Sequence, residues 1–443
     1  APVSLMNTTT IKAAIYDAGV RSPVITERYV RLANDVQNFN SDLPLVVVHS
    51  LNTEIPEDPQ VLCVATVIGT TNGRATITDP PNFIGTAGIK LRGSSSLSFP
   101  KKQYAFEIWD HNGDDESAPL LDLPKEEDWV LYGPYTDKTL MRDCISYQWS
   151  NEIGRYAPRT RYVEMFLHTV SGAVNSTDYV GTYAIVEKIK RDGERVNIEE
   201  LRPDDNTEPK ITGGYIVKKD RLDPGDVGFW TNSGQNLCYV EPKEAEISPE
   251  QSAYLINYFN EFEAALAGPN FADPLVGYAK YIDVDSWIDH HLLTEMTKNI
   301  DGYRLSTFLF KDRGGKLNMG PIWDYNLTLG NADYLQGWLP QGWYYPQLSA
   351  EEYPWWPRLF QDEAFRVRYA DRWFSLRETV FATSHMLADI DAHAAVLAES
   401  QVRNFVRWPI LGEYVWPNAP GWAQRDTYEK EVDWMKNWLV NRL

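Results

Sequence analysis

The chain has 443 residues, and its hydrophobic content of 43% excludes a mostly disordered protein. Its 62 acidic residues against 42 basic ones give a net charge of −20, which excludes a nucleic-acid partner because phosphate binding needs a basic field. No apolar run approaches the roughly 18 residues of a membrane span, so we expect no membrane span, and an acidic surface is common among secreted proteins.

Residues 1–41 predict a β-hairpin. Apolar and polar residues alternate in "TTTIKAAIYDAG" and again in "SPVITERYVRL", with Gly19 at the turn between them. A lone hairpin is only marginally stable, so its strands must join either the main sheet or another module. The segment resembles the last two strands of the chitobiase C-terminal, fibronectin-like module, which would make the chain part of a larger multidomain protein.

The next segment, residues 42–245, is rich in strand and turn signals. Strands are predicted from "LPLVVVHS" through "LSFPKKQYAFEIWD", and a second pair, 161–170 and 179–189, is joined by a polar turn. Between them, residues 136–156 have helical periodicity, with Asp137 as the expected N-cap. The order of sheet, helix and hairpin predicts an α+β fold and not the regular alternation of a Rossmann fold.

Helical patterns dominate residues 246–443. One helix is predicted to begin at a capping box formed by Ser248 and Gln251, and a second helix, 283–300, leads directly to Asp301. Trp and Tyr are frequent in 337–356. This segment therefore predicts either the aromatic core of a helical lobe or an exposed groove on which sugars could stack.

Two acidic residues, Asp301 and Asp324, stand at the two ends of a predicted β-hairpin. Gly302 allows the chain to bend after the first, and the turn "KDRGG" separates the two strands. Because a hairpin of this length folds back on itself, we expect both carboxylates in one site. One carboxylate can accept a proton from a hydroxyl group while the other holds a divalent cation, as in phosphoryl transfer. The pair could also be the acid and the nucleophile of a glycosidase.

A second candidate site lies in "RGSSSLSFPKKQY", where Gly93 and the run of three serines directly after it precede Lys101 and Lys102. Backbone donors, hydroxyl groups and positive charge on one flexible turn can hold phosphates. The same composition also fits a solvated turn, and no Walker A motif is present in the sequence.

The sequence disfavours several other kinds of site. His290 and His291 have no further ligand at helical spacing and an HExxH motif is absent, which argues against a zinc site. The absence of G-x-S-x-G argues against an α/β-hydrolase esterase. The three cysteines, Cys63, Cys144 and Cys238, allow at most one disulfide.

Five motifs resemble, in order and approximate spacing, those of the CotH kinase family: "RGSSSLSFPKKQY", "DKTLMRD", "GTYAIVEKIKRD", "NIDG" and "GPIWDYNLTLG". The resemblance covers residues 42–443, and members of the family are secreted or spore-coat proteins. It implies an atypical, two-lobed protein-kinase-like fold, with a β-rich N-lobe at 42–245, a helical C-lobe at 246–443, and ATP with Mg²⁺, Mn²⁺ or Ca²⁺ as cofactors. The implied site residues are Asp301 as the catalytic aspartate, Asp324 as a metal ligand, and Arg92, Ser94, Lys101, Lys102 and Glu187 as nucleotide-binding residues.

The chain departs from the family pattern at three positions. Ser306 stands where kinase catalytic loops carry a metal-ligating Asn, and Asn326 stands where many members have a second acid, so the implied metal ligands are altered at 306 and carry one negative charge fewer at 326. Asn318 replaces an aromatic residue that could stack on adenine. The resemblance therefore implies either a metal-dependent ATP phosphotransferase acting on protein hydroxyls at the cell surface or in secretions, or an impaired pseudokinase that binds carbohydrate or a cell surface.

Overall fold

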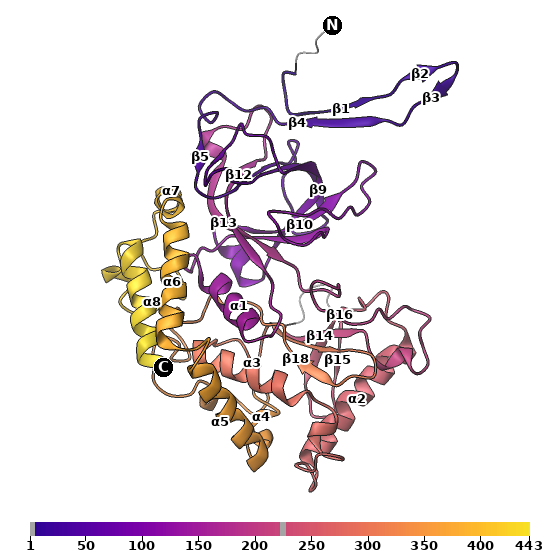
Figure 1. Ribbon diagram of the computed structural model, residues 1–443, viewed down its shortest axis with the longest axis vertical. Coiled ribbons are helices and arrows are strands. Elements are labelled where there is room, and N and C mark those ends of the chain that lie inside the picture. Colours follow the sequence, from indigo (N-terminus) through magenta and orange to yellow (C-terminus); the bar gives the residue numbers. More distant parts are fainter. Residues whose placement is uncertain (1–4, 222–226) are drawn as a thin grey trace. The chain divides into compact units, whose positions relative to one another are not determined.

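The computed structural model describes residues 5–221 and 227–443, which form two compact units (Figure 1). Each unit is assembled from segments far apart in the sequence, whereas the predicted lobes, 42–245 and 246–443, are contiguous; those boundaries stay a prediction. Among the described residues, no helix is long and apolar enough to cross a membrane. Unit 1 contains the described residues up to Tyr135, Arg159–Lys188 and Ala395–Ile410, and unit 2 contains Thr136–Pro158, the described part of 189–394, and Leu411–Leu443.

A closed barrel of seven strands forms the centre of unit 1. Neighbouring strands are antiparallel, except that β6 and β12 run parallel. Alternate residues of each strand contribute to the interior, such as Val46 and Val48 of β6 and Phe106 of β10, so apolar side chains fill the barrel. In barrel order the strands are β10 (Gln103–Trp109), β11 (Asp128–Tyr132), β13 (Tyr179–Glu187), β12 (Thr160–His168), β6 (Leu45–His49), β7 (Val61–Ile68) and β9 (Phe83–Arg92).

The mixed α+β class is confirmed, and so is the predicted strand pair β12–β13. Closure of the barrel was not predicted, because it depends on the parallel pairing of β6 with β12, two strands far apart in the sequence. The short helix α7 (Ser400–Arg407) also belongs to unit 1, where the Trp408 indole that follows it donates to the Val180 carbonyl of β13 at 2.9 Å. Unit 1 also contains the paired short strands β5 (Asn40–Ser41) and β8 (Ala75–Thr76).

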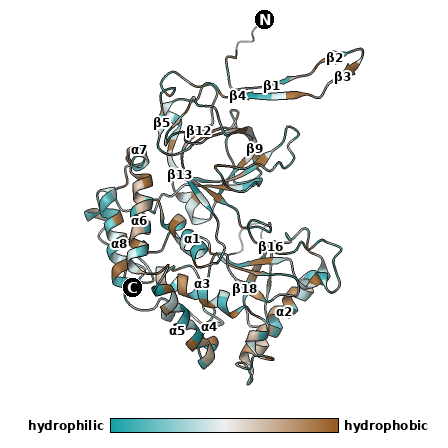
Figure 2. Cartoon of the chain, in the orientation of Figure 1, coloured by the Kyte–Doolittle hydropathy of each residue, from teal (hydrophilic) through white to brown (hydrophobic). Residues whose placement is uncertain are grey.

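The N-terminal hairpin is confirmed. Strand β1 (Thr9–Ala13) pairs with β4 (Ile25–Tyr29), and β2 (Tyr16–Asp17) pairs with β3 (Val20–Arg21) across the turn at Gly19. The alternative in which these strands join the main sheet is wrong, since β1 and β4 form a sheet of their own. Figure 2 shows hydrophobic residues around β2 and β3, where Ile15 is 74% exposed. The relation to a chitobiase-like module stays a prediction.

Unit 2 is built on a five-stranded antiparallel sheet with helices beside it (Figure 1). The hairpin predicted between Asp301 and Asp324 is present as the last two strands of this sheet. In sheet order the strands are β15 (Gly228–Trp230), β16 (Asn236–Glu241), β14 (Tyr215–Lys219), β17 (Thr307–Lys311) and β18 (Leu317–Met319). The helices are α1 (Arg142–Glu152), α2 (Pro249–Ala267), α3 (Val284–Thr297), α4 (Trp356–Leu359), α5 (Glu363–Arg377), the first part of α6 (Thr383–Leu397) and α8 (Tyr428–Arg442).

The helix starts follow local capping signals in two cases and differ in a third. The capping box of Ser248 and Gln251 is present at the start of α2, and Asp283 caps α3 by accepting from the Ser286 amide at 2.8 Å. The N-cap predicted at Asp137 is wrong, since α1 begins at Arg142. The Asp137 carboxylate nevertheless accepts the Arg142 amide hydrogen at 2.8 Å, which satisfies a donor of the first turn.

The aromatic segment 337–356 belongs mainly to the core. Tyr344, Tyr353, Trp355 and Trp356 are each at most 3% exposed and pack against other aromatic rings, so the aromatic-core interpretation is confirmed. A stacking groove along this segment is wrong, because only Trp343 among its Trp and Tyr side chains is classed as exposed. All three cysteines are buried free thiols.

Candidate functional site

Asp301 and Asp324 are joined through one buried side chain of unit 2, that of Asn299. Its Oδ1 accepts the backbone N–H of Asp301 at 3.1 Å, and its Nδ2 donates to the backbone carbonyl of Asp324 at 3.3 Å. Asn299 is fully buried, so these two bonds lie in a poorly solvated environment where they are hard to exchange for water. The main chains at the two ends of the hairpin are therefore held together.

The Asp301 carboxyl group is mostly buried, with 15% of its side chain exposed. Burial raises its pKa above the ordinary value, while the Arg304 guanidinium, whose Nη2 lies 2.7 Å from Oδ1, opposes the rise. Arg221 also lowers this pKa and Asp220 raises it. A carboxylate with a raised pKa is a stronger base than an ordinary one, which suits a group that must accept a proton.

Asp324 has a solvent-exposed side chain on a constrained backbone. Its φ of +63° lies in the left-handed region, which non-glycine residues rarely adopt and which costs free energy unless neighbours fix it. Two residues of α1 do so: the Tyr147 hydroxyl accepts the Asp324 amide hydrogen at 3.1 Å, and Asp143 Oδ1 accepts that of Tyr325 at 2.6 Å. Helix α1 thus holds the backbone from which this carboxylate extends.

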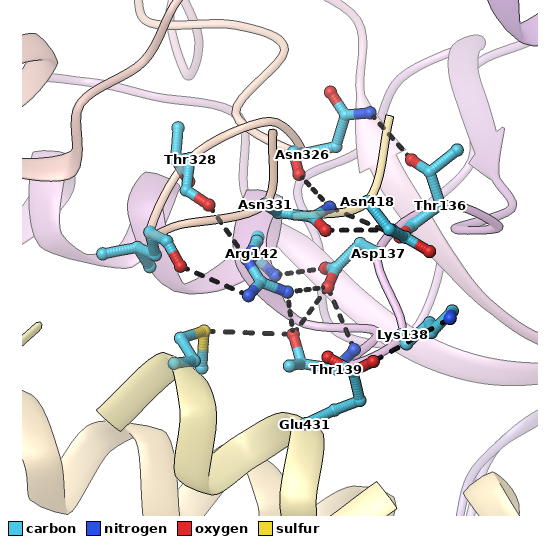
Figure 3. A network of polar contacts seen from close by, with 12 residues as sticks. Thr136, Asp137, Lys138, Thr139, Arg142, Asn326, Thr328, Asn331, Asn418 and Glu431 are labelled. Atoms are coloured by element: carbon cyan, nitrogen blue, oxygen red, sulfur yellow. Dashed lines mark hydrogen bonds and ion pairs between the residues drawn. The ribbon is translucent and has the colours of Figure 1, made fainter. Parts of the chain in front are cut away.

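The motif "DKTLMRD" supports the turn after Asp324 from below, as Figure 3 shows. The buried Arg142 forms an ion pair with the buried Asp137. Its Nε donates to the Thr328 carbonyl at 3.0 Å and its Nη2 to the Leu329 carbonyl at 3.3 Å. Two motifs that are far apart in the sequence therefore form one structural element.

Asn326, two residues after Asp324, belongs to the same network (Figure 3). Its Nδ2 lies 3.5 Å from Thr136 Oγ1, and its carbonyl accepts from Asn331 Nδ2 at 2.9 Å. Asn418 donates to both the Thr136 carbonyl, at 2.7 Å, and Asn331 Oδ1, at 3.1 Å. Asp324 and Asn326 thus carry one carboxylate and one amide oxygen, which are both of the hard type that divalent cations prefer.

The other two departures from the family pattern lie on the hairpin itself. Ser306 has a left-handed φ of +50°, and its hydroxyl lies 3.4 Å from Asp220 Oδ2. Asn318 pairs with Phe310 in the β17–β18 ladder, and its Nδ2 donates to the Lys316 carbonyl at 2.9 Å. Ser306 and Asn326 were both predicted to be metal ligands. The hydrogen-bond partner that the structure gives the Ser306 hydroxyl is Asp220 and not Asn326.

The two predicted phosphate-facing lysines lie in unit 1. Lys101 is 2% exposed, and its ammonium donates to the Thr182 carbonyl at 2.6 Å and to Asn404 Oδ1 at 2.8 Å. Lys102 is half-buried and donates to the Leu97 carbonyl. A phosphate would have to replace the interior acceptors of Lys101, because a buried ammonium group needs compensation.

Three more predicted nucleotide-binding residues also lie in unit 1. Arg92 ends β9 opposite Gln103, and Ser94 is exposed just before a 3₁₀ turn. Glu187 ends β13 fully buried, with Oε1 2.7 Å from Arg159 Nη2 and Oε2 3.0 Å from Arg159 Nε. This bidentate pair compensates the buried charge, and sequence reasoning missed Arg159 because its partner is set by strand pairing.

The histidine pair does not form a shared site. His290 Nε2 lies 3.0 Å from the Gly302 carbonyl, while His291 lies between the hydroxyls of Tyr353 and Tyr369. Burial lowers the pKa of His290 to about 4, so it is neutral at pH 7. Groups of three metal-ligand-type side chains occur elsewhere in the described residues, at Glu152, His385 and Asp389 and at Glu126, Glu127 and Asp128.

Several supporting residues were missed at the sequence level. Asn299, Asp143 and Tyr147 act through tertiary hydrogen bonds that leave no local signal. Arg304 could have been found, because a cation three residues after an acid is a helical-turn ion pair. Gly302 does not have a left-handed φ; a Cβ there would lie 2.8 Å from Thr294 Cγ2, so close packing on α3 and not a bend requires glycine.

Comparison with known proteins matches residues 89–443 to the family model described as CotH kinase protein. The match begins later than the predicted start at residue 42 and includes all five motifs. No curated protein matches the chain. Since the matched region spans most of the 443 residues and contains both Asp301 and Asp324, the chain belongs to the CotH kinase protein family.

Proposed function

We propose that this protein is a divalent-metal-dependent phosphotransferase that moves the γ-phosphoryl group of ATP to a hydroxyl group of a secreted or surface protein. The observation that carries the proposal is the junction at Asn299, which bonds to the backbones of both Asp301 and Asp324 in a chain of a kinase family. The two-lobed kinase-like arrangement, the use of ATP and an extracellular location are parts of this proposal.

Asp301 is the proton acceptor of the proposed reaction. The acceptor hydroxyl oxygen attacks the γ-phosphorus, the bond to the β–γ bridging oxygen breaks, ADP leaves, and the hydroxyl proton moves to the Asp301 carboxylate. Arg304 fixes the orientation of this carboxylate through its contact with Oδ1. The raised pKa of Asp301 favours the protonated product of the transfer.

Asp324 and Asn326 are the proposed metal-holding residues, and a bound cation would neutralise charge on the phosphates. Mg²⁺ is commonly held by one or two carboxylates together with substrate phosphates, so one protein carboxylate fits this mode of binding. The strained but supported backbone of Asp324 fixes the point from which its carboxylate extends. The assignment of nucleotide binding to Arg92, Ser94, Lys101 and Lys102 of unit 1, with Glu187 as a buried support, stays a prediction.

The proposal is tested by thermal unfolding with ATP and Mg²⁺ or Mn²⁺, together with transfer of labelled phosphate. A ligand present at 100 times its Kd stabilises the folded state by about 2.7 kcal/mol, so wild type is expected to melt at a higher temperature with metal and ATP. Asp324→Asn should lose this shift, while Asp285→Asn, an exposed carboxylate of unit 2, should keep it.

Three outcomes contradict or narrow the proposal. The absence of a shift at millimolar ATP in wild type would remove nucleotide binding. An unchanged shift in Asp324→Asn would remove the metal assignment. Binding of ATP without any transfer would leave the impaired pseudokinase, the alternative implied by Ser306, Asn318 and Asn326.

Restoring an acid at position 326 is expected to strengthen metal binding. Affinity of a hard cation rises with the number of anionic oxygen ligands, so Asn326→Asp should bind Mg²⁺, Mn²⁺ or Ca²⁺ about tenfold more tightly, on the order of 1.4 kcal/mol. Titration calorimetry on wild type, Asn326→Asp and Asp324→Asn measures the change. Equal affinities in all three proteins would place the cation elsewhere.

A further inference from the structure

Unit 2 has a polar pocket of about 480 Å³ at one end of the strands of its five-stranded sheet. At this end of the strands, β14 ends at Lys219, β15 ends at Trp230 and β16 begins at Asn236, and all three residues line the pocket. Strand β17 begins at the same end of the sheet, directly after the loop that carries Asp301. The sheet topology therefore places the pocket beside that loop.

Two contacts connect the pocket wall to the Asp301 loop. Arg304 lines the pocket and pairs with Asp301 at 2.7 Å. Asp220 also lines it and lies 3.4 Å from the Ser306 hydroxyl. A molecule in this pocket would thus lie one side chain away from the proposed proton acceptor.

The cations of the pocket are already bound by protein groups. Lys219 is buried, and its ammonium donates to the Glu351 carbonyl at 2.9 Å. Arg304 contacts Asp301 and lies 3.7 Å from Glu352. Burial lowers the pKa of Lys219 to about 8, so it stays mostly charged at pH 7. An anionic ligand would find no uncommitted cation among the lining residues and would also face the carboxylates of Asp220, Glu351 and Glu352. A cationic ligand is not excluded by these charges, so the binding test below includes one.

The unmatched groups of the pocket are neutral acceptors. Gln235, which is 3% exposed, and Asn236 both line the pocket, and Gln235 Oε1 and Asn236 Oδ1 are buried without a hydrogen-bond partner in the described part of the chain. Both oxygens have almost no solvent-exposed surface, so a ligand would reach them only after the two side-chain amides turn toward the pocket. Because an unsatisfied buried acceptor costs about 1–3 kcal/mol, hydrogen bonds donated by the ligand would then recover this free energy. Neutral hydroxyl groups are such donors.

The pocket also presents one aromatic surface. Trp230 at the end of β15 is 61% exposed, although large aromatic side chains are usually covered. A ring with an apolar face and hydroxyl groups around its edge matches a Trp face together with amide oxygens. Among neutral hydroxyl-rich ligands, a sugar ring has this combination.

We propose that the pocket beside Asp301 binds a neutral sugar residue, which stacks on Trp230 and donates hydroxyl hydrogens to Gln235 and Asn236. This inference rests on the proposed function for its reaction, since it narrows the acceptor hydroxyl to one carried by a sugar on a secreted or surface protein. Sugar binding itself requires neither ATP nor a metal, so it is measurable separately.

The binding test is calorimetry without nucleotide, with glucose, galactose, N-acetylglucosamine and their disaccharides as probes. At least one of them should bind wild type, and Trp230→Ala should weaken this binding at least tenfold, while Trp230→Phe should restore part of it. Trp343→Ala is the matched control, because Trp343 is 51% exposed in unit 2 and does not line the pocket. Its affinity should equal that of wild type.

A second variant separates a loss of sugar binding from a loss of folding. Asn236→Leu removes an unsatisfied acceptor, so it should leave the melting temperature unchanged or raised while the sugar affinity falls. Failure of every probe to bind, or equal binding by wild type, Trp230→Ala and Asn236→Leu, would overturn the inference. Binding of a lysine-rich peptide in place of the sugars, with the same dependence on Trp230, would also overturn it.

The two proposals fail in different ways. If the sugars bind but ADP is never released, the pocket assignment stands and the phosphotransferase proposal is wrong. If ATP and metal bind and phosphate is transferred to protein while no sugar binds, the phosphotransferase proposal stands and the sugar pocket is wrong. Sugar-stimulated ADP release that Asp301→Asn abolishes, with sugar affinity unchanged, supports both.

Discussion

Replacing Arg142 with Ala is expected to destabilise unit 2 by about 3–5 kcal/mol, since removal of one partner leaves a buried charge without compensation. Asp137, 1% exposed, would lose its ion pair. The carbonyls of Thr328 and Leu329, which hold the turn after Asp324, would lose their donors. Chemical denaturation of wild type and variant, monitored by circular dichroism, measures the change in the free energy of unfolding.

The matched control is Arg368→Ala, also in unit 2. Arg368 pairs with Asp285, but the two side chains are 52% and 51% exposed, and such pairs contribute about 0–1 kcal/mol. Equal destabilisation by the two substitutions would mean that the buried network in Figure 3 does not support the fold. A double variant, Arg142→Met with Asp137→Leu, should recover only the part of the loss that comes from the unpaired Asp137 charge, because the Thr328 and Leu329 carbonyls still lack their donors.

Asp301→Asn is expected to abolish most phosphoryl transfer while leaving the fold intact. Loss of a general base lowers the rate about 10²–10⁴-fold. The same substitution should raise the free energy of unfolding at neutral pH. Burial raises the pKa of the Asp301 carboxyl group, so the folded state of wild type binds the carboxyl proton more tightly than the unfolded state does. The contribution of the protonated Asp301 carboxyl group to folding stability is complete below the pKa of the unfolded state, about 3.9, and is lost as the pH rises through the pKa of the folded state.

The variant should therefore gain stability over wild type as the pH is raised from about 3.5 to 7, since Asn cannot ionise. Denaturant melts across this range, with phosphate transfer assayed at pH 7, measure both effects. Asp371→Asn, an exposed carboxylate of α5, is the control and should change neither. If Asp301→Asn kept its activity, another group would have to accept the proton. A constant stability difference at every pH would show that the carboxyl is not perturbed by burial.

Local patterns predicted the elements that depend on short stretches of sequence. The start of α2 follows from the capping box at Ser248, and the hairpin β17–β18 follows from two apolar runs around a glycine turn. The alternation of apolar and polar residues on both sides of a polar turn likewise predicted the strand pair β12–β13. In each case the hydrogen bonds that define the element join residues close in sequence.

Features that depend on distant partners could not be predicted in this way. The barrel closes through β6 and β12, and Asn299 joins Asp301 to Asp324 through bonds that its sequence neighbours do not require. Helix α1 begins at Arg142 and not after Asp137, because the Asp137 carboxylate binds both the backbone and the side chain of Arg142. The motifs predict a site at Asp301 and Asp324, but the contacts that support these two residues are tertiary.

The assignment of α7 to unit 1 has a consequence for how the chain is made. The buried Lys101 donates to Asn404, and the fully buried Glu164 is paired with Arg403, so both charges are compensated by residues near the end of the chain. During synthesis the barrel strands leave the ribosome long before their partners are translated. Unit 1 is therefore expected to complete its packing only after residue 407 has emerged, and nascent or truncated chains that stop at 394 should aggregate or be degraded.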